Sequence, residues 1–501
     1  MRYTYYIYII IASIIIAGLS SCESDDSLWD IVNQGSSSST DEDEELDESA
    51  DIVTYTSTQT SNAVDIVYAG SSATVTVSSD IESYIKVYGT GAKVKVIQSS
   101  NLKSEVTYTL SGTSTKGAFY MDGAYDMNLV FNNLTLTNAD SAAVNIQDGK
   151  LISISLVGTS TLADGSSSTD KGAIVLNGHS KFSGSGTLNV AGNANHAIWA
   201  DEYITFESSM TGTVNITKAA VDGINVNEHF EQNGGTLIIA NVGDEGVQVG
   251  AVENDEEETG YATINGGSLS VSAGSSAGKG FKTDGDITIN GGTVNITASG
   301  SEGLESDAFI YINDGTVTIN SYDDCINAQK DIYINGGNVT VISSNNDGVD
   351  ANNNLYIKGG TVMAFGGSGA ECGLDAAEGY GVYISGGNIL ALGGSSFSTS
   401  SASGMTAQPI VSTKGSATAN TTIALYSGST QLVSFTVPSN YSRSSNSGMG
   451  GMGGKSNSSI IISCSGLTSG NSYTLTNNGS STTVTASTGN SGGNHGGFGG
   501  R

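Results

Sequence analysis

The sequence is poor in proline, in charged residues and in aromatic residues. Only 2 of its 501 residues are proline, 13% are charged and 7% are aromatic, whereas glycine occurs 68 times. Serine, threonine, asparagine and β-branched residues fill much of the remainder. Proline cannot donate a hydrogen bond to a sheet, so its scarcity permits long hydrogen-bonded ladders. This composition predicts many short strands joined by tight turns rather than helices.

Basic residues are also scarce, and this limits the possible partners. Lys and Arg total 18 against 49 Asp and Glu, which gives a formal net charge of −31. Such a chain repels phosphate, so nucleic acid is excluded as a partner, whereas cations are favoured. The 4 cysteines contain no CxxC pair and the 4 histidines are scattered. The sequence therefore predicts neither a disulfide framework nor a zinc site, and it does not specify an oligomeric state.

The N-terminal segment has the pattern of an export signal. Arg2 precedes an apolar run from Ile7 to Leu19, which is too short for a membrane span and typical of a secretory signal. The run ends Leu19-Ser20-Ser21-Cys22, which resembles a bacterial lipobox. We therefore predict a signal peptide over residues 1–21 and acylation of Cys22. The alternative is an ordinary signal followed by a chance cysteine.

The segment 22–51 is predicted to be an acidic, Ser-rich tether. Directly after the cysteine, "ESDDS" resembles the signal that exports some Gram-negative lipoproteins to the cell surface. The following "GSSSSTDEDEELDESAD" carries like charges that repel and has almost nothing to bury. We expect an outer-membrane lipoprotein that is exposed at the surface and contacts the membrane only through its lipid.

Internal repeats occupy most of the chain. The second glycine of an Asn/Asp/Lys-Gly-Gly-type turn recurs at Gly292, Gly315, Gly337 and Gly360, in steps of 23, 22 and 23 residues. Between these turns, apolar and polar residues alternate with the period of half-buried strands. Each unit has about three short strands and cannot bury its apolar side alone, whereas a stack of units can. The sequence therefore predicts a parallel β-helix over residues 52–400, with coils about 4.8 Å apart.

Aligned units place like residues in columns. Two columns come from the strands around the glycine turn and a third from the strand that completes the unit. These columns are Ile264, Ile289, Ile312, Ile334, Ile357 and Ile384; Leu269, Val294, Val317, Val339, Val362 and Ile389; and Leu304, Ile326, Val349 and Leu374.

Acidic residues recur beside the third apolar column, as in "NNDGVDAN" at Asn345–Asn352. Two outward columns of carboxylates on one face repel each other, and a hard cation with oxygen ligands would relieve this. We therefore expect calcium as a cofactor, bound between coils; the alternative is a solvated acidic face that keeps the solenoid soluble. The predicted ligands are Asp222, Glu245 and Asp375, together with the densest cluster, Glu302, Glu305, Asp307, Asp323, Asp324, Asp347 and Asp350.

The chain resembles a known bacterial family in its early coils. "EVTYTLSGTSTKGAFYMDGAYDMNLVFNNLTLTNADSAAVNIQDGK" (Glu105–Lys150), the "INGGTVNI" coils and the later "YTLTNNGSSTTVT" are similar to β-helical carbohydrate-binding domains. That family was first recognised in a clostridial protein that binds cellulose and pectin-type acidic polymers. The resemblance covers Ile52–Thr485. It implies a right-handed parallel β-helix like that of calcium-dependent pectate lyases, calcium between coils, and non-catalytic binding of polysaccharide.

Two kinds of glycan are compatible with the residues. Calcium between two carboxylates would join the acidic columns to an acidic, pectin- or polygalacturonate-like polymer. A neutral, cellulosic glycan would need aromatic contacts, for which Trp199, Tyr311 and Tyr333 are the candidates. Trp199 follows an inward isoleucine and is predicted to point outward.

An enzyme and a structural protein are the alternatives. A calcium-dependent polysaccharide lyase needs a base for the proton next to the uronate carboxylate. Lys279 and Lys282 lie beside the carboxylates at Glu302 and Glu305, but those charges oppose the lowered pKa that a lysine base requires. We therefore predict that the protein is not an enzyme and that these lysines balance charge and contact ligand. A structural, adhesin-like envelope protein is the third possibility.

Beyond residue 400 the repeat fades. Residues 401–485 alternate like antiparallel strands and are predicted to form a small β domain that caps the last coil. Residues 486–501 are predicted to be a disordered Gly-rich tail. Cys325 and Cys372 lie two coils apart, about 10 Å by the coil rise, which is too far for a disulfide. Both are expected to be buried thiols.

Overall fold

The computed structural model describes residues 53–56, 61–252, 259–274, 278–367, 371–393, 406–442 and 459–488. The predicted signal peptide, Cys22, the tether 22–51, the boundary at residues 400/401 and residues 489–501 of the predicted tail lie outside these ranges. The first residues of the predicted tail, 486–488, are described and lie against β37 (Ile410–Lys414), since Ser487 pairs with Ile410. Among the described residues, no helix has the length and apolar character needed to cross a membrane.

The chain enters the fold through two hairpins. The strands β2 and β3 pair antiparallel, as do β4 and β5, and β2 then pairs in parallel with β6. A 3-10 helix, η1, links the hairpins. Sequence reasoning did not predict these hairpins, which precede the regular coils. The first elements are β1 (Val53–Thr56), β2 (Ala63–Ala69), β3 (Ser72–Ser78), η1 (Glu82–Tyr84), β4 (Ile85–Thr90), β5 (Lys93–Gln98), β6 (Val106–Ser114) and β7 (Ala118–Asp122).

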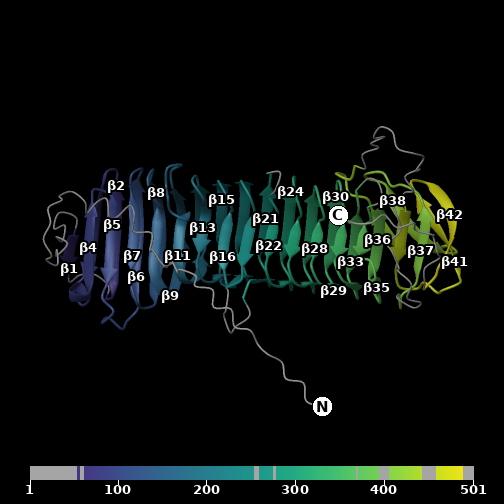
Figure 1. The fold of residues 1–501 in the computed structure, drawn as a ribbon, viewed down its shortest axis with the longest axis horizontal. Coiled ribbons are helices and arrows are strands. Elements are labelled where there is room, and N and C mark those ends of the chain that lie inside the picture. The colour runs from purple at the N-terminus through teal and green to yellow at the C-terminus, as the bar shows by residue number, and fades with distance from the viewer. Residues whose placement is uncertain are drawn as a thin grey trace, which may run out of the picture. The chain divides into compact units, whose positions relative to one another are not determined.

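The body of the protein is the predicted parallel β-helix, in which strands of successive coils lie side by side (Figure 1). Each regular coil contributes one strand to each of three parallel ladders. The irregular early coils contain β8 (Met127–Thr137), β9 (Val144–Val157), β10 (Thr159–Ala163), β11 (Gly172–Gly184) and β12 (Thr187–Gly192), of which β8, β9 and β11 are the long strands.

The three ladders are named in the order in which a regular coil passes through them. The first ladder comprises β14 (Ile204–Phe206), β17 (His229–Gln232), β20 (Tyr261–Ile264), β23 (Ile287–Ile289), β26 (Ile310–Ile312), β29 (Ile332–Ile334), β32 (Leu355–Ile357) and β35 (Val382–Ile384). The second comprises β15 (Thr213–Ala219), β18 (Thr236–Val242), β21 (Ser268–Ala273), β24 (Thr293–Ala298), β27 (Thr316–Ser321), β30 (Asn338–Ser343), β33 (Thr361–Phe365) and β36 (Asn388–Gly393). The third comprises β13 (His196–Ala200), β16 (Ile224–Asn227), β19 (Val247–Gly250), β22 (Phe281–Thr283), β25 (Leu304–Ser306), β28 (Ile326–Ala328), β31 (Val349–Ala351) and β34 (Leu374–Ala376).

The predicted apolar columns are confirmed as the core. Ile289 pairs with Ile312 in the first ladder, Val317 with Val339 in the second, and Ile326 with Val349 in the third. The members of all three columns are buried and belong to one continuous hydrophobic cluster. Burial of these β-branched and leucine side chains in every coil is the main stabilising term of such a stack.

The predicted turn glycines adopt the left-handed conformation at the corner between the first and second ladders. The φ angles are 76° at Gly292 and 75° at Gly337. The coils are also in close contact there, because a Cβ added to Gly292 would lie 2.9 Å from backbone atoms of the preceding coil. A side chain at this corner would therefore meet both backbone strain and the neighbouring coil.

A small antiparallel cap closes the second ladder, as predicted. The strand β40 pairs antiparallel with β36 of the last coil and with β37. A separate four-stranded antiparallel sheet has the order β39-β38-β41-β42. Phe365 and Leu390 of the last coils share a hydrophobic cluster with Ile423 and Phe435 of that sheet. The cap strands are β37 (Ile410–Lys414), β38 (Thr422–Ser427), β39 (Thr430–Thr436), β40 (Ser459–Ser463), β41 (Ser472–Asn477) and β42 (Ser480–Thr485).

Candidate functional site

The acidic residues of the repeat lie at the corner between the second and third ladders and on the first outward position of the third ladder. We call these two positions the corner column and the strand column. The strand column is in register coil by coil, with Asn327 paired to Asp350 and Asp350 to Asp375. The corner column comprises Asp222, Glu245, Lys279, Glu302, Asp324 and Asp347, and the strand column comprises Asn225, Gln248, Lys282, Glu305, Asn327, Asp350 and Asp375.

The aspartates of the corner column are buried, although the sequence alone suggested an exposed acidic face. Asp222, Asp324 and Asp347 are 3%, 4% and 7% exposed. Their carboxylates accept hydrogen bonds from the backbone of the next coil: Asp324 Oδ1 from the N–H of Asp347 at 2.8 Å, and Asp347 Oδ1 from the N–H of Cys372. These bonds link consecutive coils and compensate part of the cost of burying the carboxylates.

In two coils, the strand-column residue three positions after the corner aspartate donates a hydrogen bond to it. Asn225 Nδ2 donates to Asp222 Oδ2 at 2.8 Å, and Asn327 Nδ2 donates to Asp324 Oδ2 at 3.0 Å. In the next coil this position is Asp350, whose ionised carboxylate cannot donate to Asp347. The motif "NNDGVDAN" therefore replaces a carboxylate–amide pair with two carboxylates.

Asp324, Asp347 and Asp350 converge as a result. One carboxylate oxygen from each lies within 4.8 Å of the other two. Burial, together with the charge of Asp375, raises the pKa of Asp347 to about 9. Burial and the charge of Asp350 raise the pKa of Asp324 to about 7, and burial also raises the pKa of Asp350. Together the three residues form a site of oxygen ligands in which a bound cation would offset the cost of ionisation.

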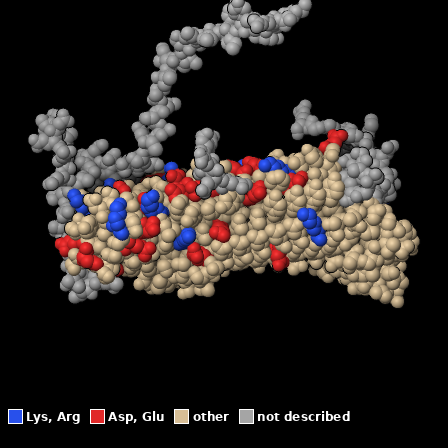
Figure 2. Space-filling model, turned by 90° about the horizontal axis from the view of Figure 1, so that it is seen from below, with Lys and Arg blue, Asp and Glu red and all other residues tan. Residues whose placement is uncertain are grey.

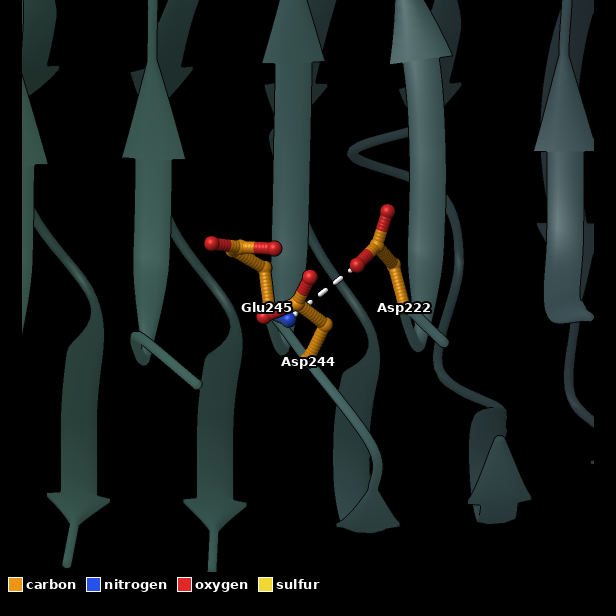
Figure 3. Close-up of side chains that lie close together, drawn as sticks. All are labelled: Asp222, Asp244 and Glu245. Carbon is orange, nitrogen blue, oxygen red and sulfur yellow. Dashed lines mark hydrogen bonds between the residues drawn. The ribbon is translucent and has the colours of Figure 1, made fainter. Parts of the chain in front are cut away.

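A second convergent group involves Asp222, Asp244 and Glu245 (Figure 3), whose nearest carboxylate oxygens also lie within 4.8 Å of one another. Asp222 already accepts hydrogen bonds from Asn225 and from the backbone of Glu245, and His196 Nδ1 lies 3.2 Å from its Oδ2. Burial alone would raise the pKa of Asp222, but the hydrogen bonds from His196 and Asn225 lower it. This group is therefore less suited to a cation than the first.

Asp244 was missed in the sequence because it precedes the corner column by one residue. Only the turn geometry brings its carboxylate beside those of Asp222 and Glu245. The same offset exists at Asp323, which was predicted as a ligand and lies half-buried beside Asp324. Adjacency to an acidic corner residue is therefore the signal that could have identified Asp244.

The remaining predicted ligands do not join these groups. Glu302 and Glu305 are engaged by Lys279, whose Nζ lies 3.9 Å from Glu302 Oε2 and is ion-paired with Glu305. Asp307 is exposed at the far end of β25. Asp375 follows Asp350 in the strand column, and burial and the charge of Asp350 raise its pKa to about 7. Of the densest predicted cluster, the structure brings together Asp324, Asp347 and Asp350.

The aromatic candidates differ in accessibility. Trp199 lies on the outer side of β13 but is only 9% exposed, because it packs with Ala142 and Val175. Lys171 Nζ lies 3.9 Å from the centroid of its ring. The chain's own side chains therefore cover the ring of Trp199. Tyr311 and Tyr333 are half-exposed in the middle of their strands.

The lysine candidates lie in the two acidic columns. Lys282 is half-buried and in register with Glu305. Burial alone would lower the pKa of Lys279, but its hydrogen bond and ion pair with Glu305 raise it. Lys279 therefore stays protonated, which agrees with the predicted charge balance. In Figure 2, Asp and Glu side chains gather along the upper edge of the stacked coils and are also scattered over the face below it, with Lys or Arg side chains among them.

The fold and the site together define a class: a parallel β-helical repeat protein whose coils carry carboxylates at one corner. The profile of the carbohydrate-binding domain-containing protein family matches residues 90–346, just over half of the chain. The chain belongs to this family.

Other comparisons add one solved structure. A polysaccharide lyase-like protein from C. thermocellum, solved as a gadolinium derivative, is 20% identical to this chain with a TM-score of 0.36. The alignment covers 64% of this chain and 99% of that one. No curated protein matches this chain.

Proposed function

We propose that this protein binds an acidic polysaccharide without cleaving it, through calcium held by Asp324, Asp347 and Asp350. The main support for this proposal is that three carboxylate oxygens from neighbouring coils lie within 4.8 Å of one another. An all-oxygen, carboxylate-rich donor set is the one that Ca²⁺ prefers. Bound there, calcium would supply positive charge for the carboxylates of a polygalacturonate-like chain. Family membership supports the carbohydrate ligand.

Binding without cleavage is favoured over the lyase alternative by the state of Lys279. A lysine that abstracts a proton must lose its own, and the ion pair with Glu305 stabilises the charged form. The repeated carboxylates also do not single out one acid/base pair. A structural, adhesin-like role remains the alternative that predicts no glycan affinity.

We further propose the cellular location from the N-terminal sequence. Cys22 would carry the lipid, and the acidic tether 22–51 would separate the β-helix from the outer membrane. A polysaccharide-binding domain displayed in this way would hold the cell against its glycan. Labelling with a radioactive fatty acid, lost on Cys22→Ser, tests the anchor.

Affinity chromatography on immobilised polygalacturonate tests the binding proposal. The purified protein should be retained in CaCl₂ and released by EDTA, while the polymer keeps its length and no unsaturated uronate forms. The double variant Asp347→Asn/Asp350→Asn should lose retention, because a neutral amide oxygen attracts calcium less strongly than a carboxylate does. The matched control, Asp307→Asn, removes an exposed acid outside the group and should be retained. Absence of retention in calcium, or equal retention of the double variant, would overturn the mechanism.

A further inference from the structure

Four tyrosines form a continuous row on the outer face of the first ladder. Tyr311, Tyr333, Tyr356 and Tyr383 each occupy the middle position of their strand and pair in register from β26 to β35. Consecutive ring centroids are 5.1, 4.9 and 4.9 Å apart, with interplanar angles of 7°, 6° and 16°. All four side chains are half-exposed. We call this arrangement the tyrosine row.

The row presents ring edges and hydroxyl groups rather than open ring faces. Each ring stacks on the next, so the faces inside the row are covered by neighbouring rings. The Tyr333 hydroxyl donates to Asp331 Oδ2 at 2.9 Å. Asp331 and Asn335 are the next outward positions on either side of Tyr333, because side chains alternate along a strand. Tyr356 likewise lies between the polar residues Asn354 and Lys358, whereas Tyr311 follows Phe309 and Tyr383 follows Gly381 at this spacing.

One lysine contacts the tyrosine row and a second lies over the phenylalanine beside it. Between Thr283 and Gly393 the sequence contains two basic residues, Lys330 and Lys358, among many acidic ones. Lys358 Nζ lies 4.8 Å from the centroid of Tyr333, and Lys330 Nζ lies 4.9 Å from that of Phe309. Lys358 therefore contacts a ring of the row, and Lys330 contacts Phe309, whose ring centroid lies 6.0 Å from that of Tyr311.

Stacked tyrosines also stabilise the coils, but the regular spacing has a further consequence. The ring spacing matches the length of one pyranose in an extended, β-1,4-linked chain. A glycan laid along the row would therefore meet one tyrosine ring per sugar. Tyrosine, asparagine and lysine supply the apolar edges and hydrogen-bond donors that recognise the C–H and hydroxyl groups of such a sugar.

We infer that the tyrosine row is a second polysaccharide-contact surface, which takes an extended β-1,4-linked glycan along the stacking direction with one sugar per coil. This inference rests on the proposed carbohydrate-binding function but not on calcium. Because the row has four rings, affinity should increase with oligosaccharide length and level off at about four or five sugars. A bent, α-1,4-linked glucan of equal length cannot follow the row and should bind more weakly.

The inference is tested by calorimetric titration of the protein in EDTA with cello-oligosaccharides of two to six sugars. Malto-oligosaccharides of the same lengths serve as the bent comparison. The test variant is Tyr333→Thr/Tyr356→Thr. Threonine is chosen because Thr288 occupies the equivalent position in the coil before Tyr311. This variant should bind at least about tenfold more weakly. Tyr333→Phe/Tyr356→Phe keeps the rings but removes the hydroxyl groups, so it measures the contribution of the hydroxyl groups to affinity. Tyr84→Thr, an exposed tyrosine outside the row, is the control and should bind like the wild type.

Each outcome separates this inference from the proposed function. Loss of cello-oligosaccharide affinity in the Thr variant, with unchanged calcium-dependent retention on polygalacturonate, would support the row. A folded Thr variant that binds as tightly as Tyr84→Thr would overturn it, as would wild-type protein that binds polygalacturonate but no cello-oligosaccharide. Wild-type protein that binds neither glycan would overturn both proposals. Circular dichroism and thermal unfolding establish that the variants are folded.

Discussion

Asp324 and Asp347 are linked from one coil to the next, because the backbone N–H of Asp347 donates to Asp324 Oδ1 at 2.8 Å. The bond brings two buried carboxylates of the corner column together. Asp350 adds a third where two other coils have an asparagine. The hydrogen bond between these coils therefore places three carboxylates close together, whereas other coils have a neutral asparagine at the position of Asp350.

Calcium should stabilise the folded protein through this group. At a free calcium concentration 100 times the dissociation constant, the free energy of unfolding should rise by about 2.7 kcal/mol. Thermal unfolding at pH 8 in CaCl₂ and in EDTA measures the shift. Asp347→Asn/Asp350→Asn should unfold at a higher temperature than the wild type in EDTA and gain little from calcium. Asp307→Asn should respond like the wild type; an equal calcium shift in the double variant would contradict the assignment.

Asp148 should make stability depend on pH away from the proposed calcium group. This side chain is 6% exposed, and among the described residues its carboxylate is hydrogen-bonded only weakly, by the backbone of Tyr125. Burial, with the charges of Asp126 and Asp122, raises the pKa of Asp148 to about 7. Because the folded state holds this proton more tightly than the unfolded state, the contribution to stability is complete below about pH 4 and is lost as the pH rises through 7.

The variant Asp148→Asn tests this dependence. At pH 8 it should raise the free energy of unfolding by about 1–3 kcal/mol, because it removes a buried charge that lies near other carboxylates. At pH 5 the effect should shrink, since the wild-type carboxyl is then protonated in the folded state. Urea unfolding of both proteins at the two pH values in EDTA gives the comparison. A difference that does not change with pH would show that Asp148 does not titrate as described.

Sequence periodicity was sufficient to predict the core and insufficient for the site. The columns of Ile289 and Val317 follow from the alternation of residues within each unit, because neighbouring coils repeat the same environment. The burial of Asp324 could not be predicted, since its partner is a backbone N–H of the next coil, which has no sequence signature. Asp244 was missed for a similar reason, because only the turn geometry places it. Lys279 was predicted correctly to balance charge, since its neighbours in the column are acidic.

Aromatic stacking between coils was recognised only in part. Tyr311 and Tyr333 were identified as outward residues, but the row continues through Tyr356 and Tyr383. Earlier coils contain a second stack, in which His179, Tyr203, His229 and Tyr261 lie ring on ring. It alternates two residue types over unequal repeat lengths, so alignment of the sequence did not reveal it.

The ion pair of Lys279 with Glu305 should matter for stability. The two side chains are 19% and 12% exposed, so removal of one partner leaves a largely buried charge. Lys279→Met should lower the free energy of unfolding by about 1–3 kcal/mol. Lys279→Met/Glu305→Gln should recover part of this loss, because the charge of Glu305 is removed together with that of Lys279 and only Glu302 keeps an uncompensated charge. Lys282→Met is the control, since the described residues include no ion pair of Lys282; equal losses for both single variants would contradict a specific pair.

Glycine at the corner between the first and second ladders should be required for two separate reasons, and a matched pair of variants distinguishes them. Gly292 and Gly70 have φ angles of 76° and 66°. A Cβ at Gly292 would lie 2.9 Å from the backbone of the preceding coil, whereas a Cβ at Gly70 has nothing within 4 Å. Gly70→Ala should therefore cost only the left-handed conformation, about 1–2 kcal/mol. Gly292→Ala should cost at least about 1 kcal/mol more, because the coils must also move apart. Chemical unfolding of the two variants measures the difference, and equal losses would show that the stacked corners tolerate a methyl group.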